Sequence, residues 1–442
     1  MKKLTCLFAC VVLLTSITFP GRNTEQKPPN ILFILADDLG RECVSSYGSD
    51  IFKTPNIDRL AREGVMFTHA FSNPYCTPTR SELLTGRYPF ATNTSRVIYD
   101  YMHHKDMVLD VSEPSFARQL QQVGYKTAIA GKWQLSFLAK QDWVHEFGFD
   151  SYMLWQIMTD KDERTTRFHN PYFRKDGKVI ADEIKDRYGP DVMVDYLIDF
   201  MKESHKEGKP FMAYYTSLLP HFPWVPTPDS EDQTIPGDVG SQEVVRGNPK
   251  FFPAMIDRLD HHVGRLMDAL DDLGITRDTI VIFLADNGTD QQLYSSIHGQ
   301  IVLGGKGTLT DRATQVPLLI RWPEKIKAGS VDDALVKVAD FLPTLCELGK
   351  APLPQQSIHG QSFAARLTGD STREERSWVF IQMADESYLR SKDWIVTDKG
   401  EYKKVQPYPK DAEEVDPETL NKATRQYLEQ LRAELFALIN VK

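Results

Sequence analysis

The sequence predicts an α/β fold in which a large, mostly parallel sheet is flanked by helices, followed by a small C-terminal α+β subdomain. Two apolar runs, NILFILADDLG and TIVIFLADNGTD, have the pattern of buried strands that stop at acidic residues. Between them, strand patterns alternate with helical patterns, which is typical of parallel sheets. Towards the C-terminus, short strand patterns and one amphipathic helix replace this alternation.

Four segments carry the expected strands. They are the two apolar runs, GYKTAIAGKWQ, and KPFMAYYTSLLPHFPWVP. Helices are expected over residues 56–63, 112–123, 190–203 and 252–273. In such sheets, ligands bind beyond the carboxyl ends of the strands. The polar residues expected at those ends are Asp37, Asp38, Lys132, His221, Asp286 and Asn287.

Residues 349–442 are expected to form the C-terminal subdomain. The segment just before it, VKVADFLPTLCELG, has a helical pattern, whereas SWVFIQM and DWIVTD are strand candidates. From Pro417 onward, apolar side chains recur at helical spacing, which predicts an amphipathic helix that packs on the subdomain. These side chains are Leu420, Ala423, Tyr427, Leu431, Leu435 and Leu438.

The composition is that of an ordinary globular protein, with 442 residues of which 41% are hydrophobic and 26% charged. This length suffices for one large domain with a subdomain. The formal charge of -9 and the absence of any basic block exclude a nucleic-acid partner held by phosphate neutralisation. An anionic substrate would therefore need a local cationic site.

Residues 1–22 are interpreted as a secretion signal peptide. Lys2 and Lys3 precede an apolar run from Leu4 to about Phe19 that is short for a spanning helix. A membrane anchor is the alternative. No later segment approaches about 18 consecutive apolar residues, so no membrane span is expected. The mature protein is expected to be secreted or periplasmic.

Removal of the signal leaves three cysteines, Cys43, Cys76 and Cys346. An odd number in an oxidising compartment leaves at least one thiol unpaired, although two of the three could form a disulfide. Thr77 as N-cap and Pro78 at the first helical position predict a helix from Pro78 to Leu84. Cys76 would then lie at the positive end of a helix, beside Arg80, where anions are attracted and thiol pKa values fall.

The residues after the two apolar runs are candidate metal ligands. Asp37, Asp38, Asp286 and Asn287 offer only oxygen atoms, and their carboxylates would repel one another without a cation. Oxygen ligands favour Ca²⁺, or less readily Mg²⁺, over Zn²⁺. The alternative is that these residues only cap strands and turns.

The segment TPNIDRLAREGVMFTHAFSNPYCTPTRSELLTGRYP resembles the signature of the formylglycine-dependent (type I) sulfatases, C-x-P-[ST]-R followed by a helix ending in T-G. Further similar segments, in the family's order, are PNILFILADDLG, GYKTAIAGKW, PFMAYYTSLLPHFPW, VIFLADNG and GGKGTLTDRATQVPLLIRWP. The resemblance spans residues 28–348, interpreted as the catalytic domain.

This resemblance implies an arylsulfatase-like enzyme with the alkaline-phosphatase-like fold. It implies a Ca²⁺ ion held by Asp37, Asp38, Asp286 and Asn287 together with the modified residue at position 76. A maturation enzyme would oxidise Cys76 to formylglycine, whose hydrate supplies the nucleophile, and this would account for an unpaired cysteine.

The remaining needs of sulfate ester hydrolysis are cations around the sulfuryl oxygens and a proton for the leaving oxygen. Arg80, Lys132 and Lys306 match the first need, and His221 matches the second. Each of these residues, taken alone, is more typical of an ordinary core or surface position, and their shared place at the strand ends is what favours the joint interpretation.

Position 134 departs from the family, which usually has G-K-W-H where this sequence has GKWQLS. Gln134 cannot act as the base that this histidine supplies for sulfate release. Three alternatives stay open: a substitute base from His103, His104 or His298, slow sulfate release, or binding of sulfated ligands without turnover.

The first functional hypothesis is an exported sulfatase acting on sulfated carbohydrates or aryl sulfates. The alternatives are a phosphodiester or phosphonate monoester hydrolase and a catalytically impaired sulfoglycan-binding protein. Substrate specificity is expected to lie in the loops 97–106, 155–174 and 223–249, which are rich in aromatic and charged residues.

Overall fold

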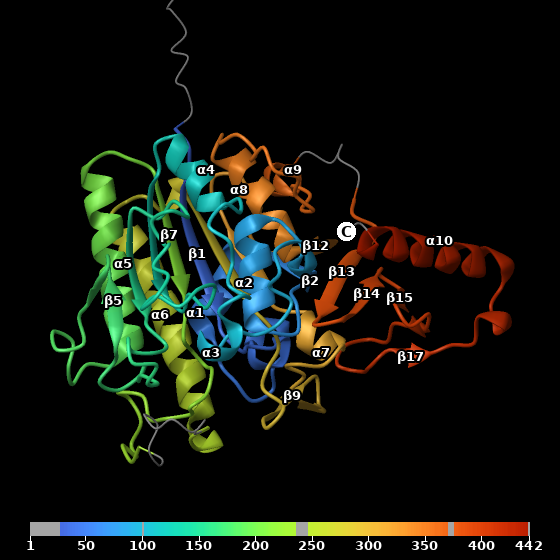
Figure 1. Ribbon diagram of the computed structural model, residues 1–442, viewed down its shortest axis with the longest axis horizontal. Coiled ribbons are helices and arrows are strands. Elements are labelled where there is room, and N and C mark those ends of the chain that lie inside the picture. The colour runs from blue at the N-terminus through green and yellow to red at the C-terminus, as the bar shows by residue number, and fades with distance from the viewer. Residues whose placement is uncertain (1–26, 100, 236–245, 370–374, 441–442) are drawn as a thin grey trace, which may run out of the picture.

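The chain is described by a computed structural model that covers residues 27–99, 101–235, 246–369 and 375–440. The expected signal peptide lies outside these residues. One large sheet with helices around it forms the body, and a smaller sheet with a long helix extends to one side (Figure 1). Among the described helices, none combines the length and the apolarity needed to cross a membrane.

The body contains a ten-stranded sheet in the order β12-β2-β11-β8-β1-β7-β3-β4-β5-β6. Strands β8, β1, β7, β3 and β4 at its centre run parallel to one another. The α/β fold with a mostly parallel sheet is therefore confirmed. The strands are β1 (Asn30–Ala36), β2 (Val65–Phe71), β3 (Lys126–Gly131), β4 (Ser151–Trp155), β5 (Phe173–Lys175), β6 (Lys178–Val179), β7 (Phe211–Thr216), β8 (Thr279–Ala285), β11 (Leu318–Arg321) and β12 (Ser330–Lys337).

The sheet also contains antiparallel strands that were not predicted from the sequence. Strand β11 is antiparallel to both β8 and β2, and β5 and β6 are antiparallel additions beyond β4. The segment VKVADFLPTLCELG is only partly helical, because Val336 and Lys337 pair with β2 as the end of β12. Helix α8 (Phe341–Leu348) begins only after a short 3₁₀ turn. There, the Asp340 carboxylate accepts a hydrogen bond from the backbone N–H of Lys337 at 2.8 Å.

Helices cover both faces of the sheet. The Tyr214 ring packs against Phe116 of α4, whereas the next residue, Tyr215, hydrogen-bonds to His262 of α6. Consecutive strand residues point to opposite faces, so α4 and α6 lie on opposite sides. Helices α1 (Pro55–Glu63) and α5 (Gly189–Lys206) pack with α6 (Phe252–Asp272), and α2 (Cys76–Thr85) and α9 (Ala364–Thr368) group with α4 (Phe116–Gln122) and α8. Shorter pieces are α3 (Tyr101–His104), α7 (Asp311–Thr314) and the hairpin β9 (Tyr294–Ile297) and β10 (Gln300–Leu303).

The C-terminal part is the predicted small α+β unit. Its antiparallel sheet contains β13 (Val379–Met383), β14 (Glu386–Arg390), β15 (Trp394–Thr397), β16 (Tyr402–Lys404) and β17 (Glu413–Glu414), and α10 (Lys422–Ile439) packs on it. The amphipathic helix is confirmed, with Leu428, Leu431 and Leu435 buried. Ala423 and Tyr427, predicted on the apolar face, are instead exposed, Tyr427 by 37%. The domain limits 28–348 and 349–442 stay predictions.

A buried ion pair fixes α2 to the end of β12. Lys337 Nζ lies 3.3 Å from Glu82 Oε2, and both side chains are fully buried. Asn73 bridges them, donating to Glu82 at 2.6 Å and accepting from Lys337 at 3.2 Å. Burial raises the pKa of Glu82 and lowers that of Lys337, so each charge depends on the other. The helix that begins at Cys76 is thereby held at a defined depth.

Replacing Lys337 by Met is expected to lower the free energy of unfolding by about 3 to 5 kcal/mol, because Glu82 would remain buried without its partner. Urea titration measures this loss. The double variant Lys337→Met/Glu82→Gln is expected to recover most of it. The matched control is Lys399→Met, which removes a surface ion pair with Glu386 and is expected to leave the unfolding free energy unchanged. Equal losses in the single and double variants would contradict this account.

Candidate active site

The ends of β1 and β8 bring three carboxylates together. The strands pair in parallel with Ala36 opposite Ala285, so the residues that follow them meet at one edge. The backbone N–H of Asp38 donates to Asp286 Oδ1 at 3.1 Å, and Asn287 Nδ2 donates to Asp38 Oδ1 at 2.8 Å. The predicted grouping of these residues is therefore present.

Two lysines neutralise the acids at the end of β1. Lys132 Nζ lies 3.0 and 2.9 Å from the oxygens of Asp37, and Lys306 Nζ lies 2.6 and 2.7 Å from those of Asp38. Burial by itself raises the pKa of Asp37, but the charge of Lys132, with further cations, holds it well below its usual range. Burial raises the pKa of Asp38, although Lys306 opposes that effect.

Lys132 owes its position to the glycine before it. Gly131 has a φ of 130°, and a Cβ there would lie 1.7 Å from the carbonyl oxygen of Thr216 on β7. The backbone N–H of Lys132 donates to that same oxygen at 2.8 Å. Only glycine permits this close approach of β3 to β7. The lysine side chain therefore leaves β3 at the edge where the carboxylates lie.

Arg80 joins the two strand ends from α2. Its guanidinium donates to Asp286 Oδ2 through Nε at 3.1 Å and Nη2 at 2.8 Å, and Nη2 lies 3.7 Å from Asp37 Oδ1. Nη1 donates to the carbonyl oxygen of Lys132 at 2.9 Å. Burial and the charge of Asp37 raise the pKa of Asp286 to about 7, against the influence of Arg80. Arg80 lies one helical turn after Cys76, so α2 places both at this edge.

Cys76 opens α2 instead of preceding it. The helix runs from Cys76 to Thr85 with Tyr75 as its N-cap residue, so the prediction of Thr77 as N-cap was wrong. The Thr77 hydroxyl donates to the carbonyl oxygen of Gln134 and accepts from the backbone N–H of Ile98. Both partners lie outside α2, so this hydroxyl does not cap the helix. Cys76 is 2% exposed. Cys43, Cys76 and Cys346 are all free thiols.

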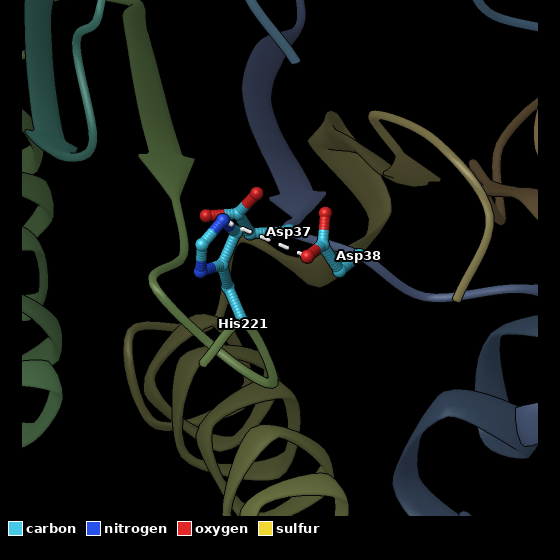
Figure 2. A group of neighbouring side chains, drawn as sticks. All are labelled: Asp37, Asp38 and His221. Atoms are coloured by element: carbon cyan, nitrogen blue, oxygen red, sulfur yellow. Dashed lines mark ion pairs between the residues drawn. The ribbon is translucent and has the colours of Figure 1, made fainter. Parts of the chain in front are cut away.

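His221 lies after β7 and faces the acids at the end of β1. Figure 2 shows its ring beside Asp37 and Asp38, with Nε2 3.6 Å from Asp38 Oδ2. Nδ1 lies 2.9 Å from Arg167 Nη2 and 2.6 Å from the carbonyl oxygen of Phe222. Protein atoms thus enclose Nδ1, and Nε2 is the nitrogen directed at the acids. Burial, together with the charge of Lys306, lowers the pKa of His221 well below its usual value.

These groups adjoin a pocket of about 940 Å³. Each of the three predicted specificity loops contributes side chains to it, and residues 290–292 and 383–384 contribute others that the sequence analysis missed. Their role in specificity stays a prediction. Among the lining residues are Tyr75, Cys76, Arg96, Tyr99, His104, Lys132, Gln134, Trp155, Arg164, Arg167, His221, Phe222, Arg246, Asp290 and Lys306.

Gln134 has both a structural contact and an unused acceptor. Its backbone is left-handed, with a φ of 53°, and its Nε2 donates to the carbonyl oxygen of Ile98 at 2.9 Å. Its Oε1 is buried without a hydrogen-bond partner in the described part of the chain. Gln134 therefore ties the segment at residue 98 to the first turn of α2 and leaves an acceptor at the pocket.

The three histidines predicted as substitute bases occupy different places. Among the lining residues that the structure describes, His104 is present and His103 and His298 are not. The His104 ring packs on Tyr99 with 4.4 Å between centroids. His298 lies in the turn between β9 and β10, where its backbone N–H donates to the carbonyl oxygen of Gly48 at 3.2 Å.

The oxygen atoms at the strand ends fit a hard divalent cation. Asn287 Oδ1 is buried and has no hydrogen-bond partner among the described residues, as expected of an atom available to a metal. Ligand atoms of Asp37, Asp38 and His221 lie within 4.8 Å of one another. Burial is the main cause that raises the pKa values of Asp38 and Asp286, and a bound cation would oppose it by favouring the charged carboxylates. This donor set suits Ca²⁺ or Mg²⁺.

Comparison with known proteins places this site in a family. The family model described as Sulfatase matches residues 29–351, and one described as N-sulphoglucosamine sulphohydrolase, C-terminal, matches residues 303–430. Arylsulfatase A of Bos taurus is 32% identical over an alignment covering 80% of this chain and 70% of its own. The N-acetylgalactosamine-6-O-sulfatase of Bacteroides thetaiotaomicron is 26% identical, covering 96% and 94%. The crystal structure of Ps i-CgsB matches with a TM-score of 0.76 at 20% identity, covering 93% of each chain.

The mostly parallel sheet, with its acidic and cationic side chains at one edge, has the fold of Ps i-CgsB. The chain belongs to the sulfatase family, and it is accordingly a sulfuric ester hydrolase.

Addition of Ca²⁺ to chelated protein is expected to raise the Tm by on the order of 3 °C, because the ion binds the folded state alone. Mg²⁺ is expected to give a smaller rise, and Zn²⁺ less than Ca²⁺. Differential scanning calorimetry measures these shifts. The variant Asn287→Ala is expected to reduce the calcium shift, whereas Asn440→Ala at the exposed end of α10 should retain it. A full shift in Asn287→Ala, or a larger one with zinc, would contradict the site.

Proposed function

We propose that the chain is an exported sulfatase that hydrolyses sulfate esters of carbohydrates, with Ca²⁺ at the strand ends and formylglycine at position 76. The observation that carries this proposal is the convergence of Cys76, Lys132, Lys306 and His221 on one pocket beside the buried carboxylates. Export rests on the basic and apolar pattern of residues 1–22. A maturation enzyme acting on Cys76 is part of the same proposal.

A sugar substrate suits both the relatives and the pocket. The relative that aligns over nearly the whole chain is named for N-acetylgalactosamine 6-O-sulfate, and another is an N-acetylglucosamine-6-O-sulfatase. The pocket volume of about 940 Å³ accommodates a saccharide. Tyr75, Tyr99, Trp155 and Phe222 supply aromatic surface, which suits the apolar faces of sugar rings.

The buried cations have distinct parts in the proposed reaction. Formylglycine at position 76 would supply, as its hydrate, the hydroxyl nucleophile, and Ca²⁺ held by Asp37, Asp38, Asp286 and Asn287 would supply positive charge beside it. Lys132 and Lys306 line the pocket and would bind the sulfuryl oxygens. Arg80 is bound to Asp286 and to the backbone at Lys132, so its part is to hold these groups in place.

His221 would serve the leaving oxygen of the sugar. The S–O bond of the ester breaks as the bond from the nucleophile to sulfur forms, and the departing oxygen needs a proton. Nε2 is the ring nitrogen not enclosed by Arg167 and Phe222, so the proton would pass from Nε2. Only the imidazolium form of His221 can give a proton to the leaving oxygen. Burial and the charge of Lys306 oppose that form, whereas the charge of Asp37 favours it.

The hypothesis of a phosphodiester or phosphonate monoester hydrolase is less well supported, because the matching family model and the relatives at higher identity are sulfatases. A sulfoglycan-binding protein without turnover is favoured by one observation, the amide at position 134 where the family usually has a histidine.

The first test is expression with and without a formylglycine-generating enzyme. The peptide that bears residue 76 is expected to change mass on conversion, and only the converted, calcium-loaded protein is expected to release sulfate from N-acetylgalactosamine 6-O-sulfate, N-acetylglucosamine 6-O-sulfate or 4-nitrophenyl sulfate. Cys76→Ala is the control, with no conversion and no release. Faster hydrolysis of bis(4-nitrophenyl) phosphate than of every sulfate ester would favour the phosphodiesterase alternative. Binding of sulfated sugars by fully converted protein without sulfate release would favour the binding protein.

The variant Gln134→His is expected to raise the rate of sulfate release, because it adds a titratable nitrogen at the pocket. Histidine also tolerates left-handed backbone better than most residues, so the fold should accept it. The gain is expected to be about tenfold or more in kcat with little change in KM, within the range of general-base effects. Steady-state kinetics on converted protein measures it. An unchanged kcat would indicate that another group, with His104 the first candidate, already acts as the base.

A further inference from the structure

Arg164 and Arg167 form an arginine pair on the pocket wall, in the loop between β4 and β5. Arg167 is 6% exposed, and its guanidinium lies 4.3 Å from the centroid of the Trp155 ring. Its Nη2 contacts His221 Nδ1 and the carbonyl oxygen of Phe222. Its Nε is buried without a hydrogen-bond partner in the described residues. Arg167 therefore has one buried donor to offer at a pocket wall.

The loop that carries the pair is braced by its own hydrogen bonds. Trp155 Nε1 donates to Thr165 Oγ1 at 2.9 Å, and the backbone N–H of Thr165 donates to the carbonyl oxygen of Ile157 at 3.1 Å. Thr159 N–H donates to the carbonyl oxygen of Glu163 at 2.8 Å, which closes the turn. The backbone on both sides of Arg164 is therefore fixed by the loop itself.

The pair differs from the other cations of the pocket in lacking a carboxylate. Arg96 and Arg246 lie 2.5 Å from Asp385 and Asp290, and the two active-site lysines are paired with the acids after β1. Within the described ranges, no carboxylate oxygen lies within 4.0 Å of Arg164 or Arg167.

The two guanidiniums also act on each other. Burial lowers the pKa of Arg167 to about 10, the charges of Asp37 and Asp38 oppose that effect, and the charge of Arg164 adds to it. Arg167 stays charged at neutral pH. A guanidinium that has no carboxylate in ion-pair contact is available to an anion, and its planar fork matches a sulfate or a carboxylate.

The position of the pair identifies the part of the substrate that it faces. The His221 ring lies between Arg167, near Nδ1, and Asp38, near Nε2. The His221 ring, which is proposed to protonate the leaving oxygen, therefore lies between Arg167 and the acids at the strand ends. We propose that Arg164 and Arg167 bind a second anionic group of the substrate, carried by the leaving saccharide. This inference rests on the proposed function and makes sugars with at least two anionic groups the preferred substrates.

The test compares matched saccharides with one and two anions. N-acetylgalactosamine 6-O-sulfate is paired with its 4,6-di-O-sulfate, and a 6-O-sulfated chondroitin disaccharide is paired with its carboxyl-reduced form. Binding to calcium-loaded, unconverted protein is measured by isothermal titration calorimetry, and kcat/KM on converted protein. The member with two anions is expected to bind about tenfold more tightly in at least one pair, as one charge-assisted contact provides. A preference for the disulfate identifies a sulfate subsite, and a preference for the unreduced disaccharide identifies a carboxylate subsite.

The variant Arg164→Gln is expected to reduce that preference about tenfold, and Arg164→Lys to retain most of it because the charge remains. Arg277→Gln, an exposed arginine at the opposite end of β8, is the matched control and should keep the full preference. Equal binding within both pairs, or an unchanged preference in Arg164→Gln, would overturn the inference. Failure of converted protein to release sulfate would instead count against the proposed function, because the binding comparison does not depend on turnover.

Discussion

Mutual repulsion of the carboxylates at the ends of β1 and β8 is the constraint on which the site depends. The register that sets Ala36 opposite Ala285 forces Asp37, Asp38 and Asp286 together in a buried place. Isolated buried carboxylates are costly, so cations must reach them from elsewhere in the fold. Lysines following β3 and β10 and an arginine on α2 meet this need. The packing of α2 and the order of the central strands are thus tied to the same electrostatic requirement.

The central strands and the grouping of acids could be predicted from the sequence because both depend on local patterns. A continuous apolar run that ends in Asp37 and Asp38 is typical of a buried strand leading to a polar site, and the second run repeats it. The antiparallel strand β11 between β2 and β8 could not be predicted, because strand direction depends on the chain path and leaves no pattern in four residues. The end of β12 was mistaken for helix because Val336 to Leu345 suits both periodicities.

Some catalytic candidates could be predicted from the sequence, whereas the residues of the pocket wall could not. Residues such as Cys76 and Arg80 lie within one short motif, so their proximity is already fixed by a single helix. Arg167 and His221 are 54 residues apart, and only the tertiary fold brings them into contact. Nothing in the spacing of Arg164 and Arg167 distinguishes them from the many surface arginines. Met383 and Ala384 could not be predicted as pocket residues either, because they reach the pocket from the C-terminal sheet.

Position 134 separates a structural task from a chemical one. The hydrogen bond from Gln134 Nε2 to the carbonyl oxygen of Ile98 requires a donor, and either an amide or an imidazole can provide it. Accepting a proton near neutral pH requires an imidazole. Glutamine therefore keeps the hydrogen bond to residue 98 but does not provide a base. The carboxylates, the lysines and His221 are paired with one another, and none of these pairs involves Gln134. The departure from the family pattern at position 134 therefore affects a side chain that takes no part in the ion pairs of the site.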